Sequence, residues 1–126
     1  MASRALAPSL FLVTTTATSA AMARPVAEIR QAQIAAASRA HAAALAAYGV
    51  GTGHLEAVYQ WSVRWMQAER ATTDKLAAIG RHRARMDVLS AEVSKRIAIG
   101  LASPADSDAV AYYLAEAELW STGELQ

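Results

Sequence analysis

Three histidines and the absence of cysteine limit the side-chain chemistry that this chain can carry. His41, His54 and His82 lie far apart in the sequence, and no His-x-x-x-His or Glu-x-x-His spacing places a second metal ligand beside any of them. Without cysteine there is no thiol nucleophile, thiolate metal site or disulfide framework. His41 and His82 fall on apolar helix stripes and are expected at the edge of the core, whereas His54 is expected in a solvated turn. No metal site is predicted.

The carboxylates and glycines carry no recognisable catalytic motif either. Glu116 and Glu118 are two residues apart, so on one helix they point in different directions and cannot act as an acid–base pair. The glycine-rich stretch 49–53 lacks the Gly-Lys-Ser/Thr ending of a phosphate loop, and neither a Gly-x-Ser-x-Gly nucleophile motif nor a dinucleotide fingerprint occurs. The sequence therefore predicts a protein that is not an enzyme and has no cofactor.

The charge is nearly balanced, with 12 lysines and arginines against 11 acidic residues. Such a balance creates no strong field, so neither nucleic acid nor an anionic membrane surface is favoured as a partner. The densest basic run, residues 81–85, could hold an anion or an acidic partner. Acidic residues lie within one or two helical turns of it, which favours a solvated helix face without a binding role.

Residues 1–23 have the pattern of an export signal. Arg4 supplies a short positive region, residues 5–13 an apolar stretch, and Ala21-Met-Ala23 the small-x-small site of signal peptidase, with cleavage after Ala23. The alternative is the Thr- and Ala-rich N-terminus of a cytosolic protein. The apolar stretch is much shorter than the roughly 20 residues that cross a bilayer, so no retained transmembrane span is expected. The pattern predicts a periplasmic or secreted protein.

Apolar residues recur every three or four positions in four segments, which is the spacing of amphipathic helices. The connections are short, so the sequence predicts an all-α fold of antiparallel helical hairpins, a small up-down coiled-coil-like bundle of three to four helices. Thr72, Thr73 and Asp74 favour a helix start, and a kink rather than a full loop is expected there. The expected helices span residues 26–48, 54–71, 74–99 and 104–120.

One pattern occurs twice, 49 residues apart: a helix ends in a glycine turn at Gly51 and again at Gly100, and an Ala-Glu pair follows later in the next helix. Each glycine is expected to end a helix at positive φ, because only glycine adopts that geometry without steric cost. Pro104 is expected at the first helical position of the last helix. The two repeats form a single domain, residues 24–126, and cover about 26–71 and 74–120.

Aromatic residues on the second and fourth predicted helices are the candidate interface. Trp61 and Trp65 lie one turn apart on a predicted stripe, and large residues at this spacing are typical of a core or a helix–helix contact rather than a ligand platform. Tyr113 (or its neighbour Leu114) and Trp120 occupy the corresponding stripe of the last helix. We expect these four aromatic residues to mediate packing within the chain or with a partner.

The repeated block resembles the helical repeat of the TolC-like outer-membrane efflux protein family. There, an apolar or aromatic residue, a Gly-Thr or Gly-Leu turn, a helix start and a late Ala-Glu recur in each half. The matching residues are Tyr48, Gly51, Thr52, Val58, Ala68 and Glu69 in the first copy and Ile97, Gly100, Leu101, Asp106, Ala117 and Glu118 in the second. The resemblance covers about residues 26–120 and implies long antiparallel helices of a periplasmic tunnel. The chain departs from the family in having one repeat pair and no alternating apolar segments for barrel strands.

Two functions follow as hypotheses. The first is a non-enzymatic exported helical protein that associates with itself or with an efflux or envelope assembly through its aromatic helix faces. The second is a small periplasmic sensor or chaperone-like module, in which Trp61, Trp65, Met66 and Met86 hold apolar or metal ligands.

Overall fold

The computed structural model describes residues 23–124, which form four helices and no strand. The helices are α2 (Val26–Gly49), α3 (Leu55–Arg70), α4 (Lys75–Ala98) and α5 (Pro104–Ser121). The all-α prediction is confirmed, and each predicted helix boundary is correct to within one residue. The predicted export signal lies almost wholly outside the described residues. Within the described range, no helix combines the length and apolarity needed to cross a membrane.

The helix boundaries repeat with the same period as the sequence pattern. Both ends of α4 (Lys75–Ala98) lie 49 positions after the ends of α2 (Val26–Gly49), and α5 begins 49 positions after α3. The glycine turns repeat as well, because Gly51 and Gly100 have φ values of 83° and 76°. The positive φ predicted for these two glycines is confirmed. The hairpins α2–α3 and α4–α5 therefore have the same local geometry.

Alanine at Gly51 or Gly100 is expected to lower the free energy of unfolding by about 1 kcal/mol, because a Cβ strains a backbone at positive φ. The space itself is available, since a Cβ at Gly100 would meet nothing within 4 Å. Gly80 is the matched control, because it lies inside α4 and is also uncrowded. Gly80→Ala is expected to raise stability by about 0.5–1 kcal/mol. Thermal melts that showed stabilisation by all three substitutions would contradict the turn geometry.

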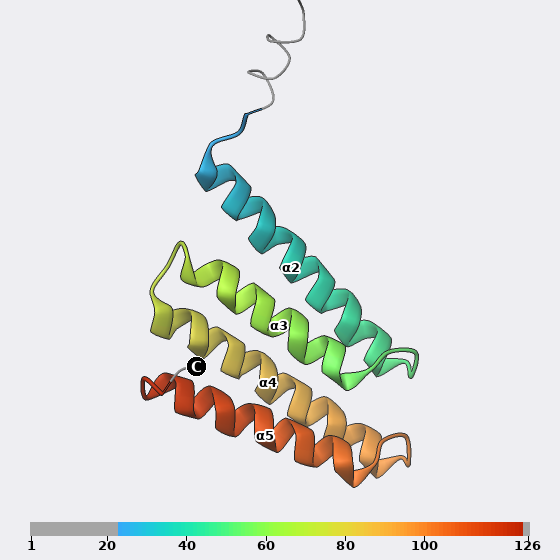
Figure 1. The fold of residues 1–126 in the computed structure, drawn as a ribbon. Coiled ribbons are helices and arrows are strands. Elements are labelled where there is room, and N and C mark those ends of the chain that lie inside the picture. Colours follow the sequence, from blue (N-terminus) through green and yellow to red (C-terminus); the bar gives the residue numbers. More distant parts are fainter. Residues whose placement is uncertain (1–22, 125–126) are drawn as a thin grey trace, which may run out of the picture.

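The connection between α3 and α4 is a full turn, so the kink expected there is wrong. Polar side chains satisfy the backbone groups that the two helix ends expose. The Thr72 hydroxyl donates to the carbonyl oxygen of Glu69 at 3.2 Å, and the Asp74 carboxylate accepts from the Ala77 amide at 3.0 Å. With both ends capped, the chain reverses direction and α4 runs antiparallel to α3 (Figure 1).

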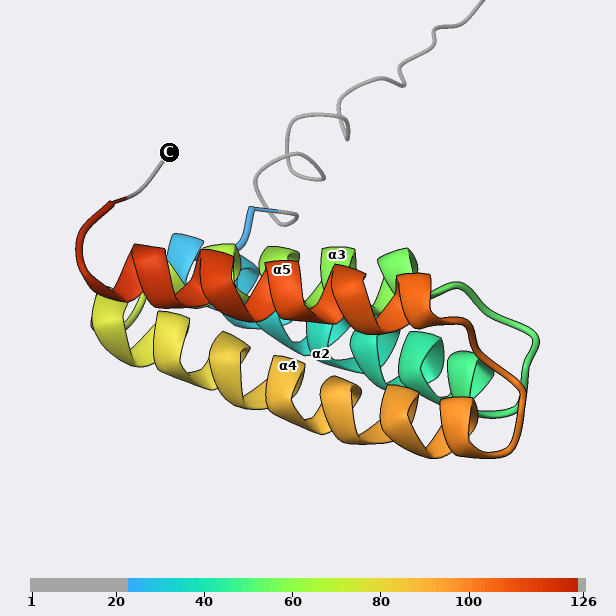
Figure 2. The same ribbon diagram turned by 90° about the horizontal axis from the view of Figure 1, so that it is seen from below.

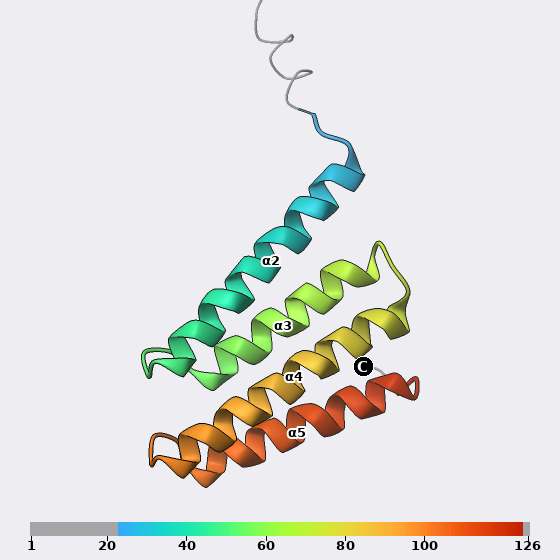
Figure 3. The ribbon, with the colours of Figure 1, turned by 180° about the vertical axis from the view of Figure 1, so that it is seen from behind.

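The two hairpins stack side by side. In the sequence-based colouring, the helices follow one another from α2 at one edge to α5 at the other (Figures 1 and 3). Seen along the other axis, α3 and α5 lie in one layer and α2 and α4 in the second (Figure 2). All extensive contacts are between helices adjacent in the sequence. The outer helices α2 and α5 therefore each have a neighbour on one side only.

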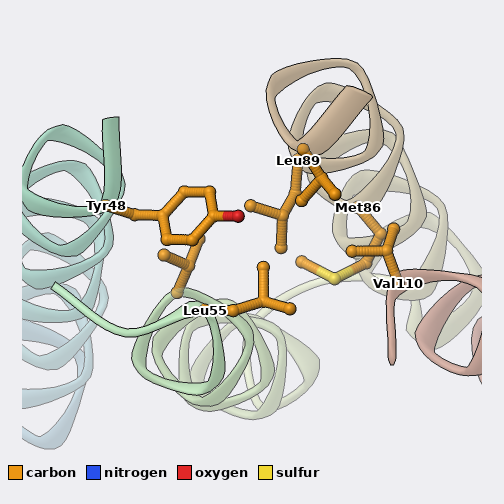
Figure 4. Packing of buried hydrophobic residues seen from close by; sticks show 7 residues of the cluster. Tyr48, Leu55, Met86, Leu89 and Val110 are labelled. Atoms are coloured by element: carbon orange, nitrogen blue, oxygen red, sulfur yellow. The ribbon is translucent and has the colours of Figure 1, made fainter. Parts of the chain in front are cut away.

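The core consists of two apolar clusters along the helix axes. The larger one joins all four helices and includes Tyr48, Leu55, Met86, Leu89 and Val110, which converge between the ribbons (Figure 4). The second lies nearer the α3–α4 turn and contains Met66, Ala78, Ile79 and Trp120. Burial of these side chains is the main favourable contribution to folding.

The Arg96 side chain links the two glycine turns by hydrogen bonds. Its guanidinium donates to the carbonyl oxygens of Gly49 at 2.8 Å and Leu101 at 3.5 Å, and it lies 4.9 Å from the centre of the Tyr48 ring. The Tyr48 hydroxyl in turn donates to the Asp106 carboxylate at 3.1 Å. These contacts link the end of α2 to the start of α5 and hold the hairpins in register.

Candidate functional site

A polar cluster is buried between α3 and α4. Ser62 Oγ lies 2.8 Å from Nδ1 of His82, and Arg85 donates from Nε to Ser62 Oγ at 2.6 Å and from its terminal nitrogen to the Ser62 carbonyl at 3.0 Å. Because a guanidinium can only donate, the Ser62 hydroxyl accepts from Arg85, and its own proton is left free to donate to Nδ1 of His82. With the Ser62 hydroxyl as the donor, the neutral His82 ring accepts at Nδ1 and carries its proton on Nε2.

Aromatic rings surround this cluster. The Arg85 guanidinium lies 4.1 Å from the centre of the Trp65 ring, and Trp65 in turn packs on His41 of α2 at 5.7 Å between ring centres. His82 packs against Trp120 of α5 at the same separation, 5.7 Å. The cluster and the rings around it thus come from all four helices, and the Arg85 cation is stabilised by an aromatic face as well as by hydrogen bonds.

A serine hydroxyl beside a histidine is the beginning of a nucleophile–base pair, but this pair is closed to solvent. Ser62 and His82 are both 0% exposed. A nucleophile must reach a substrate atom, and its base must have room to exchange a proton with it. We therefore assign the Ser62–His82 hydrogen bond a structural role.

The buried bases are held neutral. Burial, together with smaller contributions from the Arg85 guanidinium and His41, lowers the pKa of His82 to about 4. Burial, followed by the charge of Arg85, also lowers the pKa of His41. Burial reduces the pKa of Arg85 to about 10, with Glu69 acting in the opposite direction, so Arg85 keeps its charge at neutral pH. His41 and His82 lie deeper than the core edge that the sequence predicted.

The basic run at residues 81–85 is not the solvated face that was expected. Arg81 and Arg83 do point outward, and they pair with Glu69 at 3.1 Å and Glu118 at 3.3 Å. His82 and Arg85 point inward instead and form the polar cluster. The run occupies two faces of α4 because the helix packs against α3 and α5 at once.

The four candidate interface aromatics do not form one surface. Trp61 is half-buried on the side of α3 that faces the first half of α2, and Trp65 is half-buried beside Arg85. Tyr113 stacks on Tyr59 with ring centres 3.9 Å apart. Trp120 is only 8% exposed, so it offers little area to a partner. The methionines proposed as ligand groups are also separated, because Met66 and Met86 lie in different core clusters.

An open cleft of about 320 Å³ lies between α2 and α3. Alanines with small side chains line part of the cleft and leave it open. Five larger side chains complete its lining: Arg30, Gln33, Trp61, Arg64 and Gln67. The Arg64 guanidinium lies 4.6 Å from the centre of a Trp61 ring, and Arg30 donates to the Ala71 carbonyl at 3.3 Å. No carboxylate lines the cleft, and in residues 23–124 neither arginine forms an ion pair. The cleft is therefore a positively charged surface with an aromatic wall.

No cluster of three potential metal ligands occurs in residues 23–124. Comparisons with models of protein families, with curated proteins and with solved structures found no match.

Proposed function

We propose that this chain is a non-enzymatic helical protein that acts through helix–helix association, with itself or with a larger envelope assembly. The observation that carries the proposal is the uncovered outer side of the helical stack. On α5, Tyr112 is 66% and Leu119 is 56% exposed, and on α2 the apolar Ile29 is also exposed. Large exposed apolar residues grouped on one helix are typical of interaction surfaces.

An envelope role is supported by two features of the sequence. The predicted export signal directs the chain out of the cytoplasm. The repeated hairpin, with its Gly-Thr and Gly-Leu turns, resembles the TolC-like family, whose members work through packing of long helices. Both features fit a protein that functions by forming an assembly rather than by catalysing a reaction.

Light scattering of the purified chain over a wide concentration range tests the proposal, together with cross-linking in cells followed by capture of the chain. We expect a molecular mass that rises with concentration, or specific capture of an envelope protein. A chain that stays monomeric and captures no envelope protein would rule the function out.

The α2–α3 cleft favours a second candidate, a small periplasmic sensor or chaperone-like binding module. Trp61 lines this cleft and would report a ligand directly through its fluorescence. Fluorescence that does not change across a panel of metal ions and unfolded client proteins would exclude this alternative.

A further inference from the structure

The α2–α3 cleft corresponds, through the repeat, to a surface that is already occupied elsewhere in the molecule. Moving 49 positions along the chain from Gln33, Arg64 and Gln67 leads to His82, Tyr113 and Glu116 in the second hairpin. All three of these residues contact α3: His82 bonds to Ser62, Tyr113 stacks on Tyr59, and Glu116 accepts from the Tyr59 hydroxyl. The α2–α3 cleft is therefore equivalent, through the repeat, to the surface of the α4–α5 hairpin on which α3 packs.

The helix that corresponds to α3 is α5. The α3 residues that enter the second hairpin, namely Tyr59, Ser62, Val63 and Met66, correspond to Asp108, Ala111, Tyr112 and Ala115. In α3 the equivalent side chains are buried or half-buried, whereas all four positions on α5 are exposed. The chain therefore carries both halves of a packing interface, the α2–α3 cleft and the exposed face of α5. The helices α2 and α5 lie at opposite edges of the stack (Figures 1 and 3).

We propose that α5 of one copy docks into the α2–α3 cleft of a second copy and so repeats the packing of α3 on the α4–α5 hairpin. This inference rests on the association function proposed above and names its partner and its two surfaces. The contact is head-to-tail, because the cleft and α5 are different surfaces of the chain. It continues the stack of hairpins from one copy to the next, as in repeat proteins whose terminal repeats lack a polar cap.

The charges of the two surfaces are complementary. Three of the four carboxylates of α5 already bond within the chain, Asp106 to Tyr48, Glu116 to Tyr59 and Glu118 to Arg83. The fourth, Asp108, lies on the exposed face of α5, which contains no lysine or arginine, whereas the cleft contains Arg30 and Arg64 and no carboxylate. In the docked arrangement, Asp108 faces Arg64 of the next copy, at the place where Tyr59 stacks on Tyr113 within one chain. Such opposed charges set the register of an interface and speed its formation. They also make the association weaker at high salt.

Charge reversal tests the pairing in the full-length chain. By sedimentation velocity, Arg64→Glu and Asp108→Arg are each expected to weaken self-association about tenfold or more. The chain carrying both substitutions is expected to recover most of the loss, because the opposed charges are restored in reversed order. Arg39→Glu on α2 and Asp87→Arg on α4 are matched controls, because both residues are exposed and neither lies on the cleft or α5. Circular dichroism checks that every variant is folded.

The outcomes separate this inference from the broader function. Suppose that the chain self-associates but Arg64→Glu and Asp108→Arg weaken this association no more than the control substitutions do, or that the double variant associates as weakly as the single variants. The head-to-tail contact is then wrong, and the association function stands. The same holds if the chain is monomeric but captures an envelope protein. If the chain is monomeric and captures nothing, both fail.

Discussion

Replacing Ile79 by alanine is expected to lower the free energy of unfolding by about 2–5 kcal/mol. Ile79 is 0% exposed and packs in the cluster near the α3–α4 turn, together with Met66 of α3 and Trp120 of α5. Removing its outer carbons leaves a cavity that three helices would have to close together. Because helices that pack in a small domain rely mainly on such contacts, a loss of this size is a large fraction of the total stability.

Leu76→Ala is the matched control for this substitution. Leu76 lies on the same helix, three residues earlier, but it is 57% exposed. Its replacement is expected to change stability by less than about 0.5 kcal/mol. Urea denaturation of both variants measures the difference. Equal losses, or a small loss for Ile79→Ala, would show that the second core cluster does not hold the hairpins together.

Acidification from pH 7 to pH 4.5 is expected to lower the free energy of unfolding by roughly 2–3 kcal/mol through His82 alone. Burial holds the folded-state pKa of His82 at about 4, below its ordinary value of 6.5. Between these two values the unfolded chain binds a proton that the folded chain does not, so stability is present above pH 6.5 and is lost as the pH falls toward 4. His41, whose pKa is also lowered by burial, adds to the loss in the same direction.

Urea denaturation at both pH values, with two variants, isolates the contribution of His82. The double variant Ser62→Ala/His82→Leu removes the titrating ring together with its hydrogen-bond partner, and it is expected to lose most of the pH dependence. His54→Gln is the control, because it removes an exposed imidazole outside the buried cluster and is compared with the unaltered chain at both pH values. If the double variant loses as much stability on acidification as the unaltered chain, His82 is not the buried neutral base described above.

The helices and their glycine turns could be predicted because local chemistry determines them. Apolar residues spaced by three and four positions favour a helix, and Gly51, Gly100 and Pro104 favour a turn or a helix start close to their own positions. The helix boundaries and the positive φ values of the two glycines agree with these local signals. The turn at residues 71–74 was misjudged for a reason that is also local. Thr72 and Asp74 cap both helix ends at once, and this combination permits a reversal rather than a kink.

The polar cluster could not be predicted because it depends on contacts between distant residues. The sequence pattern placed Trp61 and Trp65 on the main packing stripe of the second helix, whereas the buried residues of α3 include Ser62 and Met66. Serine has no apolar signal, and only the presence of His82 and Arg85 on the neighbouring helix makes its burial favourable. Likewise, α3 packs on both α2 and α4, so a single stripe does not describe it.

The match between the cleft and α5 could not be predicted from the sequence either, although both lie inside the repeat that the sequence shows. Equivalent positions hold different residues, such as Tyr59 and Asp108 or Tyr113 and Arg64. Only the equal helix boundaries reveal that these residues occupy equivalent places. Composition at the two surfaces differs because one interface lies within the chain and the other, in our proposal, lies between chains.

Disulfide trapping tests the association of copies most directly, because the chain has no cysteine of its own. Arg64→Cys and Asp108→Cys are prepared as separate chains that differ in mass, and they are mixed and oxidised mildly. If α5 docks in the cleft, the mixture forms mainly the disulfide between the two different chains, whereas Val88→Cys, at an exposed site on α4, forms a disulfide with neither. Dominant disulfides between identical chains, or equal trapping with Val88→Cys, would contradict head-to-tail docking of α5 in the cleft.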